Sequence, residues 1–166
     1  NEQLKTAIDA YVSALIACQR ADGYLGPFDG LDGYTELWNH YSVLYGLLLY
    51  HEDTQDPAAL AACEKLGDLL VQTFGPDGPQ VPKAGGANEA ICHAMALLYK
   101  RTGKPAYLDF VNYVMREVWC GPGGVDFLNS GLKHRPVAQF PVRRWEGIHN
   151  LGALAEMYWL SGREDY

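Results

Sequence analysis

The sequence lacks the cysteine spacings that mark zinc sites and disulfide frameworks. It has four cysteines in 166 residues, and the shortest separation between them is the 28 positions from Cys92 to Cys120. No CxxC or other zinc-ligand spacing is present, so a structural zinc site is not expected. Cys18, Cys63 and Cys92 fall in apolar helical stretches, where a free cysteine behaves as a small hydrophobe. We therefore expect buried thiols ahead of disulfides or metal ligands.

Basic charge and long apolar runs are also scarce. Lys and Arg total 13 against 20 Asp and Glu, which gives a formal net charge of −7. A surface of that sign argues against nucleic acid or an anionic membrane as a partner. No apolar run approaches the about 20 residues that a membrane-spanning helix needs. Nothing in the sequence fixes a cellular compartment.

Strand patterns and the common catalytic motifs are missing as well. Val, Ile and Thr never form alternating runs between tight turns, as the strands of a sheet would. There is no nucleophile elbow, P-loop, dinucleotide-binding fingerprint or HExxH motif. The sequence therefore predicts an all-α fold, and no single motif assigns a reaction.

Aromatic residues, by contrast, are abundant. They make up 12% of the chain, with 11 Tyr and 4 Trp. Tyr and Trp combine an apolar face with a polar edge, which suits a groove that stacks on sugars or other flat ligands. The same residues also fill the cores of large helical bundles, so the composition alone leaves both interpretations open.

The chain contains an internal repeat. Aligning Thr54, Thr102 and Ser161 brings three segments into register, and Trp38 and Trp145 each stand 16 positions before their turn residue. Small residues recur eight positions before the turn, which predicts a close approach of helices there: Gly46, Ala94 and Ala153. Self-similarity at about 50 residues is typical of repeated helical hairpins.

Each turn carries signals for the end of one helix and the start of the next. Gly103 and Gly162 can adopt the left-handed conformation that ends a helix. Pro57 and Pro105 suit the first turn of the following helix. Apolar residues at positions 3, 6, 9 and 13 after each proline form an amphipathic stripe. A further amphipathic helix is expected over residues 2–20.

The long connections predict where a site would lie. Segments 23–33, 75–87 and 121–141 are rich in Gly and Pro, and each comes just before the first helix of a hairpin. Hairpins packed side by side would form a solenoid or a closed toroid, with these loops at one end. Long loops gathered at one end are a usual place for a functional site.

Polar and aromatic residues concentrate at these junctions. The candidate substrate-binding residues are Asp22, Tyr24, Trp38, Asn39, His40, Asn88, His93, Arg144, Trp145 and His149. The candidate catalytic residues are Glu36, Glu89 and Glu146. Two carboxylates across a cleft could hydrolyse a glycosidic bond, one protonating the leaving oxygen and the other attacking or activating water. No metal ligands are assigned.

Structural roles are equally open for these residues. The three glutamates lie near predicted helix N-termini, where an acid stabilises the helix dipole without any catalytic role. A single histidine on a helix can be a hydrogen-bonded structural residue, and two tryptophans at one repeat position can serve packing.

Four segments resemble the β-L-arabinofuranosidase-like glycoside hydrolases. They are DGYLG (22–26), ELWNHYSVLYGLLLYHEDTQDPAAL (36–60), ALLYKRTGKPAYLDF (96–110) and ALAEMYWLSGRED (153–165). The resemblance implies an (α/α) toroid of about six hairpins, of which residues 1–166 would be a single domain supplying about half. In that family a Glu acid/base and a zinc-binding cysteine cluster that includes the nucleophile lie further along the chain. None of the four cysteines here matches that cluster, so no cofactor is expected in this segment. A sugar-binding histidine of the family is mirrored, shifted in register, by His40.

The sequence as a whole therefore predicts a glycoside hydrolase, or a part of one, whose partner is an oligosaccharide of plant or bacterial glycans. Two alternatives stay open. One is another sugar enzyme on the same scaffold, such as an unsaturated uronyl hydrolase or a sugar epimerase, because a fold does not fix the chemistry. The other is a non-catalytic helical-repeat scaffold. Half a toroid would expose its flank, so self-association is also expected.

Overall fold

The computed structural model describes residues 1–31, 36–78, 81, 86–140 and 145–166, and these residues form helices and no strand. The α-helices are α1 (Glu2–Ala17), α2 (Glu36–Thr54), α3 (Pro57–Phe74), α4 (Ile91–Thr102), α5 (Pro105–Tyr113), α6 (Phe127–Leu132) and α7 (Trp145–Ser161). Shorter turns are the 3-10 turns Asn88–Ala90 and Val137–Gln139 and a π-helical turn, Val114–Trp119, that continues α5. The predicted all-α class is confirmed.

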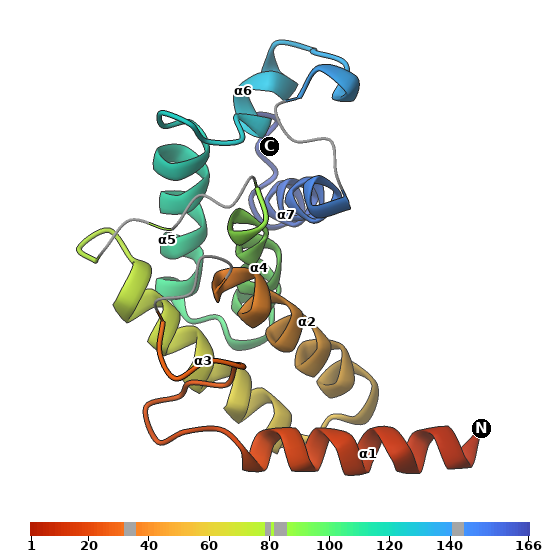
Figure 1. Cartoon of the computed structure of the whole chain (residues 1–166). Helices are drawn as coiled ribbons and strands as arrows, with labels where there is room; N and C mark the ends of the chain where they lie inside the picture. Colours follow the sequence, from red (N-terminus) through yellow and green to blue (C-terminus); the bar gives the residue numbers. More distant parts are fainter. Residues whose placement is uncertain (32–35, 79–80, 82–85, 141–144) are drawn as a thin grey trace.

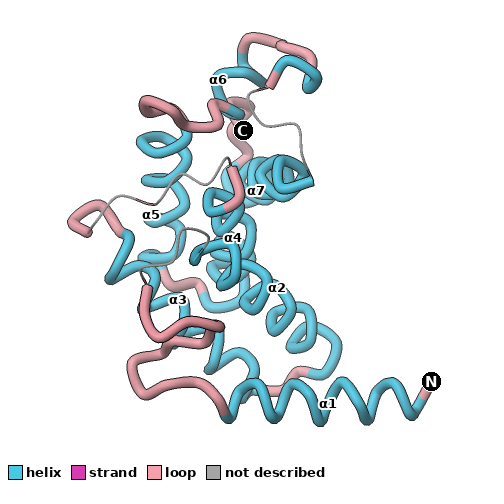
Figure 2. The backbone as a smooth tube through the Cα atoms, viewed as in Figure 1, coloured by secondary structure: helices cyan, strands magenta, loops and turns pink. Residues whose placement is uncertain are grey.

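The helices form two rows. Helices α2, α4 and α7, which are the first helices of the three predicted hairpins, lie side by side (Figure 1). Helices α3 and α5 pack behind them and against each other, and α1 packs on α3. Figure 2 shows the short loops that join α2 to α3 and α4 to α5, so each pair of helices forms a hairpin. This arrangement confirms tandem hairpins of an (α/α) toroid fragment.

The core lies between the two rows. The apolar stripes predicted after Pro57 and Pro105 are the faces that pack there, and their most deeply buried members are Cys63, Leu66, Leu70, Val111, Val114 and Val118. Facing them are Leu44 and Leu47 of α2 and Leu98 of α4, each at most 1% exposed. Burying one such side chain contributes about 1.5–3 kcal/mol, so this seam holds the hairpins together.

One hydrogen-bond motif recurs at all three predicted turns. The hydroxyls of Thr54, Thr102 and Ser161 donate to the carbonyl four residues earlier, at 2.8, 2.8 and 2.6 Å. Each hydroxyl oxygen also accepts from the backbone N–H two residues later. The hydroxyl thus adds a second bond to a carbonyl of the last helical turn and gives a partner to a backbone N–H just beyond the helix. The repeat register deduced from these residues is therefore structural.

A close approach of helices was predicted at Gly46, Ala94 and Ala153, and this prediction is wrong at Gly46. A Cβ built on Gly46 would meet nothing within 4 Å, so α2 is not in close contact there. Ala94 and Ala153 are fully buried. Helices α4 and α7 also approach closely one residue earlier, at Gly152, where a Cβ would lie 3.2 Å from the ring of His93.

The four cysteines are free thiols. Cys63 and Cys92 are buried, as expected, whereas Cys18 is exposed just after α1 and Cys120 is half-buried. Burial raises the pKa of Cys63 to about 12, so this residue stays a neutral thiol. None of the helices formed by the described residues is long and apolar enough to cross a membrane.

Candidate functional site

The N-terminal halves of α2, α4 and α7 bring aromatic rings together into one aromatic cluster, which consists of Trp38, Tyr41, Tyr45, His93, Trp145 and His149. The rings of Trp38 and Trp145 meet edge to face, with centroids 4.7 Å apart. Tyr41 stacks on Trp38 with centroids 5.3 Å apart. Trp38 and Trp145 are 107 positions apart in sequence but lie in contact, because the first helices of the hairpins are neighbours. The aromatic cluster thus forms one wall of the molecule.

The hydroxyl of Tyr41 connects two histidines from different helices. Its Oη lies 2.6 Å from Nδ1 of His149 and 3.3 Å from Nδ1 of His93. Tyr41 itself is 2% exposed, while both histidines are only partly buried. The three side chains therefore join α2, α4 and α7 by hydrogen bonds beneath a surface that solvent reaches.

Burial keeps this trio uncharged at neutral pH. Desolvation lowers the pKa of His93, opposed by the charge of Glu156. Desolvation also lowers the pKa of His149, opposed by Glu146. Burial raises the pKa of Tyr41 far above its ordinary value. The imidazoles and the phenol thus act as hydrogen-bond donors and acceptors and not as ions.

A second network lies beneath the loop that precedes α2. Oε1 of Glu36 accepts from the Tyr24 hydroxyl at 2.9 Å and lies 2.9 Å from Nε2 of His40. Nδ1 of His40 faces the Leu25 carbonyl at 3.2 Å, and the Tyr24 hydroxyl accepts from the Phe28 N–H at 3.0 Å. Glu36 and His40 are fully buried. Burial lowers the pKa of His40 to about 4, and the contact with Leu25 opposes that shift.

Both nitrogens of His40 therefore face oxygen atoms. A carbonyl can only accept, so the contact with Leu25 places a proton on Nδ1. A favourable contact at Nε2 then needs a second proton between the imidazole and Oε1 of Glu36. The network ties the DGYLG segment to the first turn of α2, which supports the wall formed by Trp38.

The remaining predicted residues occupy several environments. Asn88 is fully buried, and its Oδ1 accepts from the N–H of Trp38 at 3.1 Å, which caps α2 from the neighbouring hairpin. Glu89 is 1% exposed, while Asn39 and Glu146 are partly buried. Asp22 is exposed and binds the Tyr24 N–H and Arg20, so it shapes the turn at Gly23. Arg144 lies outside the described residues.

Comparison with known proteins places this architecture in a family. Residues 1–156 match the model of the family described as "Beta-L-arabinofuranosidase, GH127 catalytic domain". The chain belongs to this family. It is also similar to the non-reducing end beta-L-arabinofuranosidase of Bifidobacterium longum subsp. longum, at 28% identity over 127 residues. That match covers 68% of this chain and 19% of the relative, so the chain spans about a fifth of its length.

Membership of a glycoside hydrolase family gives the aromatic cluster its context, because GH127 proteins act on glycans.

The residues that sequence reasoning missed are Tyr41, Tyr45 and Asn150. Trp38, Tyr41 and Tyr45 follow a spacing of three and then four residues, which places them on one helix face. Asn150 is fully buried and its Nδ2 donates to the carbonyl of Gly86 at 3.0 Å, which holds the start of the second hairpin against α7.

The zinc that the family resemblance implies does not fit this chain's own donors. The described residues contain no group of three or more His, Cys, Asp or Glu side chains placed to hold a metal ion. Cys63 and Cys92 lie in the core with raised pKa values, whereas a zinc ligand must be a thiolate. No step of a GH127 reaction is therefore assigned to a metal held by these residues.

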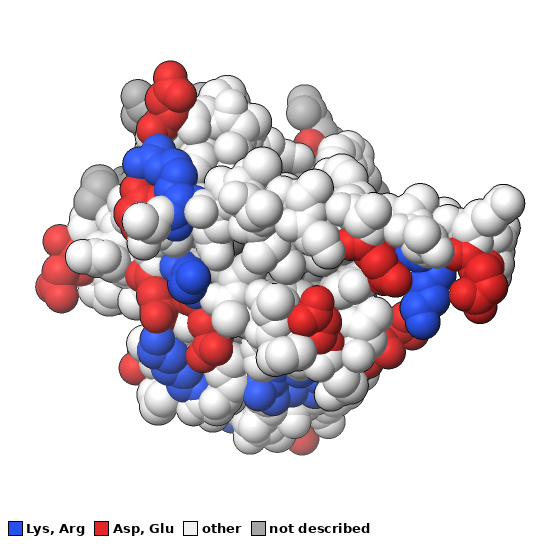
Figure 3. Space-filling view, turned by 90° about the horizontal axis from the view of Figure 1, so that it is seen from below, with Lys and Arg blue, Asp and Glu red and all other residues white. Residues whose placement is uncertain are grey.

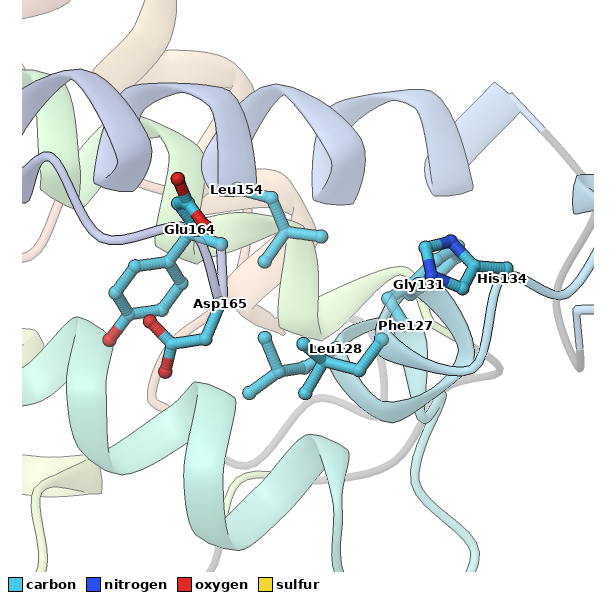
Figure 4. Close-up of a pocket in the computed structure, with 9 residues that line it drawn as sticks. Phe127, Leu128, Gly131, His134, Leu154, Glu164 and Asp165 are labelled. Atoms are coloured by element: carbon cyan, nitrogen blue, oxygen red, sulfur yellow. The ribbon is translucent and has the colours of Figure 1, made fainter.

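A hollow lies away from the aromatic cluster. It has a volume of about 310 Å³ and lies between α6, the middle of α7 and the last turn of the chain (Figure 4). Phe127, Leu128 and Leu154 line its apolar side, and Glu164 and Asp165 line its acidic side. None of the predicted site residues lines it.

Proposed function

We propose that this GH127 chain provides a sugar-binding wall of a glycoside hydrolase that acts on glycans ending in L-arabinofuranose. Membership of the family supports glycan hydrolysis, and the β-L-arabinofuranosidase activity for which the Bifidobacterium relative is named supports the sugar. The described residues favour binding over catalysis as the contribution of this segment, because Glu36 and Glu89 are buried.

The observation that carries the proposal is the corner formed by Trp38 and Trp145 beside the two histidines. Trp145 is 58% exposed although it contacts Trp38 and lies 6.0 Å from the His149 ring, centroid to centroid. An indole with a free face can stack on the apolar side of a sugar ring. Neutral imidazoles within the same cluster can donate to and accept from the hydroxyls at the ring edge.

The test is calorimetric titration of the 166-residue chain with arabinofuranose oligosaccharides. We expect Trp38→Ala and Trp145→Ala to weaken binding about tenfold each, equal to about 1.4 kcal/mol. Trp159→Ala is the matched control. Trp159 is 69% exposed and lies near the C-terminus of α7, at the opposite end of the helix from Trp145. Equal affinity in all three variants, or no binding by the wild type, would overturn the proposal.

A second measurement addresses the reaction. Aryl L-arabinofuranosides and unsaturated uronides are offered to the longest chain that contains this sequence, and released aglycone is followed. Release from the arabinofuranoside supports the proposal, whereas release from the uronide alone identifies another sugar enzyme on the same scaffold.

A further inference from the structure

The contacts of Tyr41 determine where the protons lie on His93 and His149. A tyrosine hydroxyl has one hydrogen and can donate to only one acceptor. Oη of Tyr41 nevertheless lies within hydrogen-bond distance of two Nδ1 atoms. Among the described residues no third group lies within hydrogen-bond distance of this hydroxyl, so its hydrogen points to one ring nitrogen and the other contact is N–H donating to oxygen. The two neutral imidazoles consequently carry their protons on opposite nitrogens.

The distances assign the two roles. The contact with His149 is 2.6 Å and that with His93 is 3.3 Å. Bonds donated by a hydroxyl are shorter than bonds donated by a ring N–H, so Tyr41 donates to Nδ1 of His149 and accepts from Nδ1 of His93. His149 then has its proton on Nε2, and His93 has a free acceptor at Nε2. Among the described residues, no partner occupies Nε2 of either ring.

We propose that Tyr41 is a positioning residue that fixes His93 and His149 in opposite tautomers, so that the aromatic cluster offers one Nε2 acceptor and one Nε2–H donor to a ligand. The ring centroids are 6.5 Å apart. A neutral ligand with neighbouring hydroxyls fits such a pair, because each hydroxyl both donates and accepts. This inference rests on the proposed function for the identity of the ligand, but the tautomers themselves need no ligand.

Gly152 is the second positioning residue. A Cβ at this position would lie 3.2 Å from Cε1 of His93 and 3.4 Å from both of its ring nitrogens. Contacts that close require the neighbouring ring to shift by a few tenths of an ångström. A methyl group at residue 152 would therefore push the His93 ring away from Tyr41. The substitution removes no hydrogen-bond donor or acceptor.

The tautomers can be read directly by long-range ¹H–¹⁵N NMR of the histidine rings in the unliganded 166-residue chain. Signals are assigned with His93→Gln and His149→Gln. We expect a proton on Nδ1 of His93 and on Nε2 of His149. Tyr41→Phe and Gly152→Ala should both abolish the difference. Identical tautomers in the wild type, or opposite tautomers that persist in Tyr41→Phe, would overturn the inference.

Two control variants separate this effect from a general loss of structure. Tyr45→Phe removes a hydroxyl from the ring that stacks on Tyr41 at 5.6 Å, and Gly46→Ala adds a methyl where there is open space. Both should keep the wild-type tautomers. In sugar titrations, Tyr41→Phe should lose about tenfold in affinity and Gly46→Ala, which lies outside the aromatic cluster, should not. Opposite tautomers in a wild type that binds no sugar would refute the proposed function and leave the tautomer assignment standing.

Discussion

At the scale of single residues, the charge state of each side chain in this site depends on how far burial desolvates it. His93 and His149 are held neutral by desolvation, although Glu156 and Glu146 pull their pKa values upward. At both positions, desolvation therefore changes the pKa more than the nearby carboxylate does. Glu36 is buried in the same way, and its Oε1 accepts from the Tyr24 hydroxyl and lies 2.9 Å from Nε2 of His40. Charge at this site is controlled by packing.

A pH dependence of stability follows at the residue scale. The pKa values of His93 and His149 lie below the ordinary 6.5, so the unfolded chain binds protons more readily than the folded chain. The free energy of unfolding should be constant above pH 6.5 with respect to these residues. It should fall as the pH drops from 6.5 toward their folded pKa values.

Urea denaturation at pH 7.5 and 5.5 measures this dependence. His93→Gln should reduce the loss of stability between the two values, since it removes one of the groups responsible. His134→Asn is the control, because His134 is exposed and Asn tolerates its φ of +52°. An unchanged pH dependence in His93→Gln would contradict the assignment.

At the scale of elements, the hairpin turn is the unit that repeats. The residue after each hydroxyl has a positive φ: +58° at Gln55, +68° at Gly103 and +66° at Gly162. Glycine suits two of these positions, while Gln55 adopts the left-handed conformation at a cost. Its Nε2 donates to the carbonyls of His51 and Glu52, which offsets part of that cost.

These turns give opposite expectations for two substitutions. Gly103→Ala should lower the free energy of unfolding by about 1 kcal/mol, because alanine is strained at this φ and has no compensating contact. Gln55→Gly should raise it by about 0.5 kcal/mol, the relief of strain being larger than the loss of two exposed hydrogen bonds. Thermal and urea unfolding of both variants measure these changes. The same sign for both would show that φ does not control the turns.

At the scale of the whole molecule, the two ends of the helical rows carry uncovered apolar side chains. On α1, Leu4 is 59% and Tyr11 68% exposed; on α7, Ile148 is 68% and Trp159 69% exposed. Figure 3 shows the face on which α1 lies, where uncharged residues cover much of the surface and charged residues form separate groups at both sides and in the lower part of the view. Large apolar side chains exposed at both ends of the helical rows favour association.

We therefore expect the 166-residue chain to self-associate. Sedimentation velocity should show a weight-average mass that rises with concentration. The paired substitutions Leu4→Glu with Tyr11→Lys, or Ile148→Glu with Trp159→Glu, should restore a monomer without unfolding the chain. A monomer at every concentration tested would contradict this expectation.

Much of the fold was predictable because its signals are local. Thr54, Thr102 and Ser161 bond to groups within four residues, and Pro57 and Pro105 start their helices through their own backbone geometry. Trp38 and Trp145 were recognised as a pair from the repeat register alone. The structure brings them into contact.

Tyr41 was not predictable, since a tyrosine on an amphipathic helix is ordinarily a core residue. Its hydrogen bonds reach residues 52 and 108 positions away. The sequence by itself determined the helices of the hairpins, their turns and the end of the molecule at which polar residues gather, because these depend on backbone bonding and periodicity. Helix α6 was missed, since it lies inside segment 121–141, which was expected to be a connection. Only the tertiary structure decided that Glu36 and Glu89 are buried and that Tyr41 joins His93 to His149. Burial and distance depend on how neighbouring hairpins pack.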